Sequence, residues 1–366
     1  MAPISPSSKI VVVGSGVFGI STALWLARSG YEDVTVLDMQ DTASAAYDPS
    51  SGVDSASADL NKIIRFSYGT EIEYQRLATE AAKMWDEWNR EILAASTDEL
   101  PERLKNKDRK LWWNVGMLRM SCTSDLGDFE TATLENMERE GIRETQFRTD
   151  DDVDVSRAKE HSWAHKLDPC RRRERLGSHK AVLDSTAGFV YAYKSCAWAQ
   201  HLARKAGVKM ILDPQRGKVV DITTEDDHPV VHTADGLRHV ANLVVVAEYI
   251  SVNFPELVPL GITSTRLCWY TDSIDDSFVV DFVPGRPGVA VCSGGSGHGF
   301  KFLPILGREV VKILEGKGSQ TVYGHMWRWR SSSEPMRNGL EEGEQGPRVL
   351  SKQRMATEAD WTFEGQ

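Results

Sequence analysis

The first forty residues alternate between apolar runs and a glycine-rich turn. Residues 9–13 form a short β-branched run that is apolar through its core, which is typical of a buried parallel strand. Residues 14–19 read Gly-Ser-Gly-Val-Phe-Gly, and apolar residues then recur at helical spacing until Gly30. A second apolar run, residues 34–37, ends in Asp38. This order predicts a strand, a glycine turn, a helix and a second strand that ends in an acid.

The glycine turn has the spacing of a dinucleotide-binding loop. Gly14 permits the tight turn, Gly16 lets the backbone approach a pyrophosphate, and Gly19 lets the helix lie close to the sheet. The unpaired N–H groups at the helix start favour anionic phosphates. The residues expected to bind the cofactor here are Gly14, Ser15, Gly16, Val17, Phe18 and Gly19. The alternative interpretation is a glycine-rich turn of some other α/β domain.

Asp38 narrows the choice of dinucleotide without deciding it. Its carboxylate would accept hydrogen bonds from ribose hydroxyls and repel a 2′-phosphate, so NADP is disfavoured while FAD and NAD both remain open. A nicotinamide dehydrogenase would continue with another strand and helix. Here residues 43–60 are small and polar instead, and the pattern next predicts a helix over residues 74–88.

The rest of the chain predicts further strands and one more helical segment. Residues 112–120 are typical of a strand pair or hairpin, and residues 289–292 of a buried strand. A glycine-rich stretch, residues 293–299, then leads into a segment that is apolar and helical over residues 303–314. A β-meander closing on a core strand is predicted over residues 218–223, 229–233, 237–240 and 243–247.

Composition excludes several classes of protein. The 366 residues are 41% hydrophobic and 26% charged, as in an ordinary globular protein of about two domains. A net charge of −10 argues against a nucleic-acid binder, and no apolar run is long enough to cross a bilayer. Five dispersed cysteines argue against disulfides and against a zinc site. No secretory signal precedes the first strand and no peroxisomal address ends the chain, so we expect a cytoplasmic protein. We also expect a monomer that holds no metal.

Three segments together resemble the flavin-dependent amine oxidases of the sarcosine oxidase, fructosyl amino acid oxidase and saccharopine oxidase type, especially the fungal members. They are residues 14–38, the stretch Asn-Lys-Ile-Ile-Arg-Phe-Ser-Tyr-Gly at 61–69, and a C-terminal block at 266–304 that contains Ser-Gly-Gly-Ser-Gly-His-Gly-Phe-Lys-Phe. The resemblance implies FAD as cofactor. It also implies that the loop after residue 293 places a helix start at the flavin pyrimidine edge, where it stabilises negative charge.

The resemblance further implies which residues surround the flavin and the substrate. Cys268 matches the cysteine that forms a thioether to the flavin in the family, so it is the candidate for covalent attachment; the alternative is a buried, inert cysteine. Arg65 matches the arginine that holds the substrate carboxylate, and Lys301 the lysine that adds a second cationic contact. Further cofactor-binding residues implied are Ser57, Asp59, Asn61, Lys62, Val219, Gly297, His298, Gly299, Phe300 and Lys301.

The implied reaction is the oxidation of a secondary amine in an amino acid, such as an N-methyl, saccharopine-like or fructosyl amino acid. Hydride would pass from the carbon beside the amine to flavin N5, water would hydrolyse the imine, and O₂ would be reduced to H₂O₂. The expected catalytic residues are Arg65 and Lys301, and the expected partners are the amino-acid substrate and O₂.

One departure from the family lies after the strand at residues 243–247. Glu248 stands where the family has a glycine near the flavin, and the chain reaches Arg266 almost at once. The stretch missing between them carries, in the family, strands over the substrate and the lysine that promotes the oxygen reaction. A genuine deletion and an altered gene model both remain open. The alternative function is therefore a catalytically inactive flavin-binding or partner-binding remnant.

The expected architecture is α/β. A doubly wound, Rossmann-like FAD-binding domain of the glutathione-reductase type would comprise residues 1–90, 180–250 and 266–325. Residues 91–179 would form a smaller, truncated α+β substrate domain. Residues 330–366 are expected to be a poorly ordered tail, because they are rich in Ser, Glu, Gly and Arg.

Overall fold

A six-stranded sheet lies at the centre of the fold. The computed structural model describes residues 4–41, 57, 59–69, 71–106, 108–121, 125–169, 171–177, 179–246, 271, 273 and 275–330. The strand order is β14-β15-β13-β1-β2-β9, parallel throughout except for the antiparallel pair β14 and β15. The strands are β1 (Lys9–Val13), β2 (Asp33–Asp38), β9 (Lys209–Leu212), β13 (Leu243–Val246), β14 (Val279–Phe282) and β15 (Val289–Ser293).

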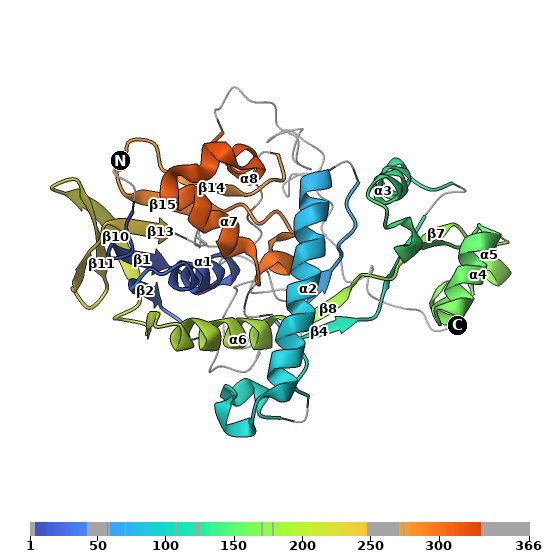
Figure 1. Cartoon of the computed structure of the whole chain (residues 1–366), viewed down its shortest axis with the longest axis horizontal. Helices are drawn as coiled ribbons and strands as arrows, with labels where there is room; N and C mark the ends of the chain where they lie inside the picture. The colour runs from blue at the N-terminus through green and yellow to red at the C-terminus, as the bar shows by residue number, and fades with distance from the viewer. Residues whose placement is uncertain are drawn as a thin grey trace, which may run out of the picture.

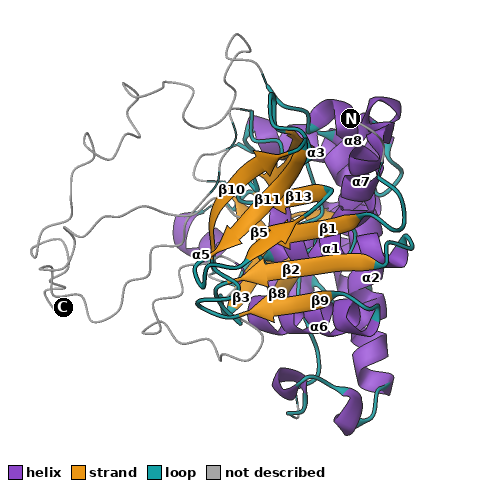
Figure 2. Cartoon of the chain, turned by 90° about the vertical axis from the view of Figure 1, so that its left-hand side faces the viewer, coloured by secondary structure: helices purple, strands orange, loops and turns teal. Residues whose placement is uncertain are grey.

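Both faces of this sheet are covered, which explains the uninterrupted apolar character of β1. Ile10 and Val12 pack into the large core on the helical face, while Val11 packs on the opposite face against Val231. Figure 2 shows the helices behind the sheet and the meander in front of it. The helical face carries α1 (Val17–Arg28), α6 (Ala192–Lys205) and α7 (Leu306–Lys312), and the meander is β10 (Val219–Glu225), β11 (His228–Thr233) and β12 (Arg238–Val240).

Two small antiparallel sheets carry most of the remaining strands. One has the order β3-β8-β4 and the other β5-β7-β6. The hairpin predicted over residues 112–120 is wrong, because β4 pairs with β8 whereas β5 pairs with β7. The chain turns at Gly116 (φ +73°) to pass from one sheet to the other. Their strands are β3 (Asn61–Ile64), β4 (Trp112–Asn114), β5 (Met117–Met120), β6 (Gln146–Arg148), β7 (Ala181–Asp184) and β8 (Gly188–Tyr191).

A long helix, α2 (Ile72–Ala94), runs between the six-stranded sheet and the region that holds α3, α4 and α5 (Figure 1). It begins and ends beyond the predicted residues 74–88, and it buries Trp85 and Trp88. The other helices are α3 (Asp128–Arg139), α4 (Asp152–Glu160), α5 (Arg172–Leu176) and α8 (Val322–Met326), with a π-helical turn at Ile313–Lys317 and 3₁₀ turns at Thr97–Glu99, Glu102–Leu104, Arg143–Thr145, Ala164–Lys166, Gly299–Phe302 and Gly318–Gln320. None of the described helices is long and apolar enough for a bilayer crossing.

Strand pairing crosses one of the predicted domain boundaries. Strands β7 and β8 follow residue 180, yet they pair with β4, β5 and β6 from residues 91–179. Strand β3, from the N-terminal part, also pairs with β8. The small sheets are therefore built from several parts of the chain, and the division into two domains stays a prediction. The predicted tail after Arg330 lies outside the described residues.

Candidate functional site

The glycine turn between β1 and α1 forms as predicted. Gly14 has φ +97°, a conformation that favours glycine, and its N–H donates to the carbonyl of Leu37 at 2.8 Å. Gly16 is the N-cap of α1 and offers no side chain to the helix start, whose first turn holds no acid. The first turn thus keeps the positive end of a helix dipole directed at whatever lies before it.

Asp38 lies at the end of β2 and is oriented by the same turn. Its Oδ2 accepts hydrogen bonds from the backbone N and the hydroxyl of Ser15 at 2.7 and 2.9 Å, and its Oδ1 accepts one from the N–H of Gln40 at 2.8 Å. Val17 N donates to the Ser57 hydroxyl at 3.0 Å, which brings a residue from beyond β2 to the helix start. A carboxylate fixed in this way can still accept from a ribose hydroxyl.

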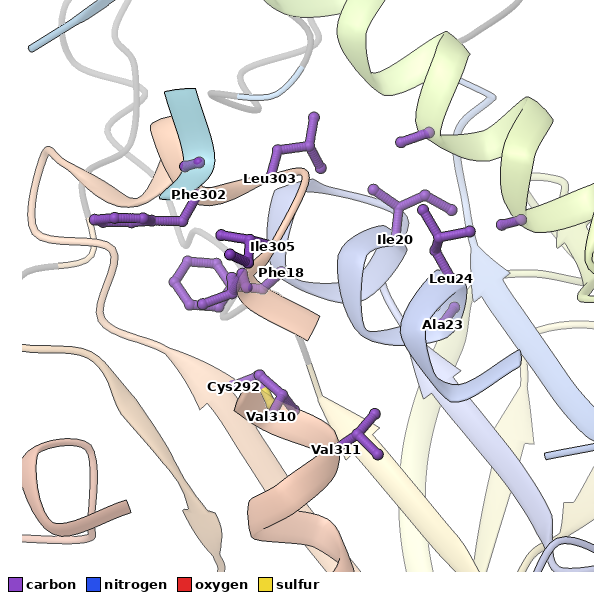
Figure 3. Packing of buried hydrophobic residues seen from close by; sticks show 14 of the residues in the cluster. Phe18, Ile20, Ala23, Leu24, Cys292, Phe302, Leu303, Ile305, Val310 and Val311 are labelled. Carbon is purple, nitrogen blue, oxygen red and sulfur yellow. The ribbon is translucent and has the colours of Figure 1, made fainter. Parts of the chain in front are cut away.

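The second glycine-rich segment converges on the first. A Cβ at Gly295 or Gly299 would lie 3.4 or 3.1 Å from the ring of Phe18, so backbone packs directly against the side chain that follows the first turn. Phe18 also makes an edge-to-face contact with Phe278 at 5.3 Å. Figure 3 shows Phe18 near Ile305 in the core that α1 shares with the C-terminal segment. Residues nearly 280 positions apart in the sequence thus pack against one another.

A chain of hydrogen bonds runs through two buried side chains and the half-buried His298 next to these glycines. Lys301 Nζ lies 2.7 Å from the Tyr68 hydroxyl, which lies 3.0 Å from His298 Nδ1. His298 Nε2 lies 2.9 Å from the carbonyl oxygen of Asp276. A carbonyl oxygen only accepts, so Nε2 carries the proton of the neutral ring and Nδ1 has a lone pair. Tyr68 therefore donates to His298 and accepts from Lys301.

Burial sets the protonation of this chain. It lowers the pKa of Lys301 well below the ordinary lysine value, with the Arg65 charge as the next cause. Burial, followed by the Lys301 charge, lowers the pKa of His298 to about 3. Burial also raises the pKa of Tyr68 well above 10. The Tyr68 ring, 4.4 Å from Lys301 Nζ, favours an ammonium by about 2 kcal/mol. Burial of an ion without a counter-charge costs several kcal/mol, which exceeds the stabilisation by the ring. Desolvation therefore keeps Lys301 uncharged.

Arg65 is a half-buried cation on the segment that follows β3. Its guanidinium lies 5.1 Å from the centre of the Phe129 ring, and it makes no hydrogen bond or ion pair with any residue in the described part of the chain. Its charge acts on both Lys301 and His298. Arg65 and Lys301, which are 236 positions apart in the sequence, are therefore near enough for the charge of one to act on the other.

A buried polar cluster, missed in the sequence, holds the Arg65–Tyr68 segment in place. Asp184 is fully buried and accepts hydrogen bonds from Ser67 Oγ at 2.7 Å and Gln146 Nε2 at 2.8 Å. Arg119 Nη1 donates to Ser67 Oγ at 2.9 Å and lies 3.7 Å from Asp184 Oδ2. Because Ser67 lies within the segment, this cluster ties the segment to strands β5, β6 and β7.

The structure gives the remaining predicted residues definite but peripheral places. Lys62 forms an ion pair with Asp59 at 2.6 Å at the start of β3, where Asn61 is exposed. Val219 lies on β10 and packs with the small cluster that includes Leu37. Neither contact shows a ligand role or opposes one. Cys268 and Glu248 lie outside the described residues.

The comparisons with known proteins fit this geometry. Residues 9–249 match the family described as FAD dependent oxidoreductase. The chain belongs to this family. It is 22% identical to the L-saccharopine oxidase of Schizosaccharomyces pombe over 88% of the chain and 93% of that protein. It is also 44% identical, over 52 residues and 14% of each chain, to the N-methyl-L-tryptophan oxidase of Salmonella dublin.

Solved structures agree on the fold. A modified fructosyl peptide oxidase from Aspergillus nidulans superposes with a TM-score of 0.66 at 22% identity, covering 90% of this chain and 95% of that one. A mutant of Amadoriase I from Aspergillus fumigatus gives 0.60 at 21% identity over 90% and 91%. The predicted family and α/β fold class are thereby confirmed, and FAD is confirmed as the family's cofactor.

The residues in this chain fit FAD. The uncapped helix start at Gly16 suits a pyrophosphate, and Asp38 suits a ribose. The backbone of Gly294–Gly299 carries no bulky side chain except His298, whose ring is held away in hydrogen bonds to Tyr68 and Asp276. A planar ring could approach this backbone closely. Within the described residues, no group of His, Cys, Asp and Glu side chains has the arrangement of a metal site.

Proposed function

We propose that this protein is a flavin-dependent oxidase of amino acids that carry a secondary amine, such as N-methyl, saccharopine-like or fructosyl amino acids. The observation that carries the proposal is a pair of basic side chains, Arg65 and Lys301, neither of which has an acidic partner among the described residues. Arg65 lies over the Phe129 ring but forms no hydrogen bond or ion pair with the described residues, and Lys301 donates only to the neutral Tyr68 hydroxyl. Two basic groups without an acidic partner suit the carboxylate of a ligand.

The residues of the chain would divide the work between cofactor and substrate. Arg65 presents a planar fork that holds both carboxylate oxygens, and Lys301 adds a third donor from the far side. Fixing the carboxylate orients the carbon beside the amine. When bound, FAD would accept a hydride from that carbon and pass the electrons to O₂, giving H₂O₂, while water hydrolyses the imine product.

The cofactor would lie along the residues predicted for it. The glycine turn and Asp38 would hold the pyrophosphate and ribose, and the backbone of 297–300 would border the flavin. Asp59, Lys62 and Val219 stay proposed contacts, as does the thioether through Cys268. A flavin that remains with the protein after acid precipitation would support the thioether, and complete release would refute it.

Replacing Arg65 tests the carboxylate site. In Arg65→Met, we expect kcat/KM for an N-methyl amino acid to fall at least about 100-fold, close to 3 kcal/mol, because two charge-assisted hydrogen bonds are lost. Peroxide release measures this across a panel of N-methyl, saccharopine-like and fructosyl amino acids. Arg76→Met is the matched control, since Arg76 is exposed on α2 and pairs with Glu73 and Glu140; its kcat/KM should not change. Equal loss in both variants would refute the assignment.

A second candidate function is favoured by one observation. The alignment with the S. pombe enzyme extends over 428 positions, more than the 366 residues of this chain, so part of that enzyme has no counterpart here. A protein that binds flavin but does not oxidise amines would fit such a loss. Yellow protein that releases no peroxide with any member of the panel would support this alternative and contradict the oxidase.

A further inference from the structure

Lys301 has the surroundings of an uncharged amine. It is only 3% exposed, and its Nζ lies 4.4 and 5.7 Å from the centres of the Tyr68 and Phe302 rings. It forms no ion pair with any described residue, and its single hydrogen bond goes to Tyr68. The chain Lys301–Tyr68–His298 uses one N–H of the amine, because Tyr68 must accept from it. The other N–H and the lone pair of a neutral amine stay unused.

The titratable groups around Lys301 include no ion-pair partner among the described residues, although the charges of Glu71 and Asp184 raise its pKa. They come from each element packed against it: Arg65, Tyr68, Glu71, Asp184 and His298. Asp184 is occupied by Ser67 and Gln146, and Glu71, the residue before α2, forms no ion pair with Lys301. Arg65 is positive and works against a second positive charge. Burial and this neighbour together hold the pKa of Lys301 low.

We infer that Lys301 is the proton acceptor for the substrate ammonium, a step that rests on the proposed function. An amino acid enters as a zwitterion, and its carboxylate brings to Lys301 the negative charge that the site lacks. One proton leaves the substrate nitrogen, which keeps the bonding electron pair as its lone pair, and the Lys301 lone pair takes that proton. The amine becomes neutral, Lys301 becomes an ammonium, and no proton is exchanged with solvent. Hydride loss then starts from the neutral amine.

A carboxylate without an ammonium group separates proton uptake by Lys301 from proton release by the substrate. Propionate brings the charge but no proton, so the holoprotein must take one from solvent. Calorimetry of propionate binding at pH 8, in HEPES and in Tris, measures that uptake from the difference in buffer ionisation heat. We expect uptake approaching one proton per propionate, and a dissociation constant that rises about tenfold per pH unit from pH 8 to 9. Propionamide, which is neutral, should bind without uptake.

Variants test whether Lys301 is the group that takes up the proton. Lys301→Arg keeps a permanent positive charge, so it should bind propionate with no uptake and a flat pH dependence. Glu71→Gln and Lys194→Met should keep the uptake, and Lys194 is the matched control because it is equally buried. Binding without uptake in the unaltered protein, or uptake that persists in Lys301→Arg, would overturn the inference alone. Absence of propionate binding would overturn the carboxylate site of the proposed function as well.

Discussion

Two lysines of this protein are equally buried but have different partners. Lys194 and Lys301 are each 3% exposed, and each lies over a tyrosine ring, at 4.7 and 4.4 Å. Lys194 donates to the carbonyl of Asp108 at 2.8 Å and lies 3.3 Å from its carboxylate. Lys301 has the neutral hydroxyl of Tyr68 instead. Only one of the two therefore has its counter-charge within the described protein.

The difference shows that the partners of a buried lysine, and not its burial alone, indicate its role. A lysine with a carboxylate and a carbonyl is a satisfied structural contact, because its charge is neutralised where it lies. A lysine with the same burial and no acid either loses its proton or waits for an anion from outside. Lys301, which has Arg65 as a neighbouring charge, is inferred to lose its proton and to take one up again when an anion binds. Arg119, paired with Asp184 beneath the same segment, follows the pattern of Lys194.

The largest effect is expected at Lys301 itself. Lys301→Met should raise the free energy of unfolding at pH 7 by about 2 kcal/mol, because it removes a buried group that is costly to charge. The pKa of Lys301 is lower in the folded state, so between that pKa and about 10.5 the unfolded chain holds more protons. Stability of the unaltered protein then rises with pH, and the advantage of the variant should shrink from pH 7 to 10.

Urea unfolding of both FAD-loaded proteins at several pH values measures this difference. A Lys301→Met protein that is less stable at pH 7 would show that Lys301 is a satisfied contact like Lys194. An advantage that stays constant across the pH range would show that the gain comes from packing of the methionine and not from charge.

A smaller effect of opposite sign is expected at Asp108. Asp108→Ala leaves Lys194 buried with only a carbonyl, and should lower the free energy of unfolding by about 1 kcal/mol; the value is modest because Asp108 is 41% exposed and water can replace it in part. Thermal melting of the variant checks this. A Lys194→Met variant should not gain the stability expected of Lys301→Met, and a gain of the same size would remove the distinction between the two lysines.

The smallest effect is expected at the pair formed by Asp59 and Lys62. Both side chains are about one quarter exposed, so solvent screens their attraction. Asp59→Asn should change stability by less than about 1 kcal/mol in urea unfolding, and less still in high salt. If Asp59→Asn lowered the free energy of unfolding more than Asp108→Ala does, partial burial and not ion pairing would determine how much a charged side chain contributes to stability.

The sequence predicts the sheet better than the pairing of the small strands. The apolar run at residues 9–13 and the glycine turn predict β1 and the start of α1, because periodicity and turn chemistry are local properties. Residues 112–120 show the limit. Their pattern indicates strands, but the partners of β4 and β5 lie about 60 to 80 residues downstream, and no local pattern identifies those partners.

The candidate site also contains residues that the sequence predicts and residues that only the fold reveals. Arg65, His298 and Lys301 stand in segments that resemble a known family, so their proximity could be predicted. The role of Tyr68 could not, although Tyr68 lies in one of those segments, because only the fold brings its hydroxyl between Lys301 and His298. The pairing of Arg119 with Asp184 gives no sequence signal either, since both residue types are usually exposed.

The position of β1 in the middle of the sheet has a consequence for synthesis. This strand pairs on one side with β2, which follows soon after it, but on the other side with β13, more than 230 residues later. During translation one edge of β1 therefore has unpaired backbone N–H and C=O groups until nearly two thirds of the polypeptide has emerged from the ribosome. The loop before Lys301, which is proposed to border the flavin, is made later still, so the complete proposed cofactor site forms only after that closure.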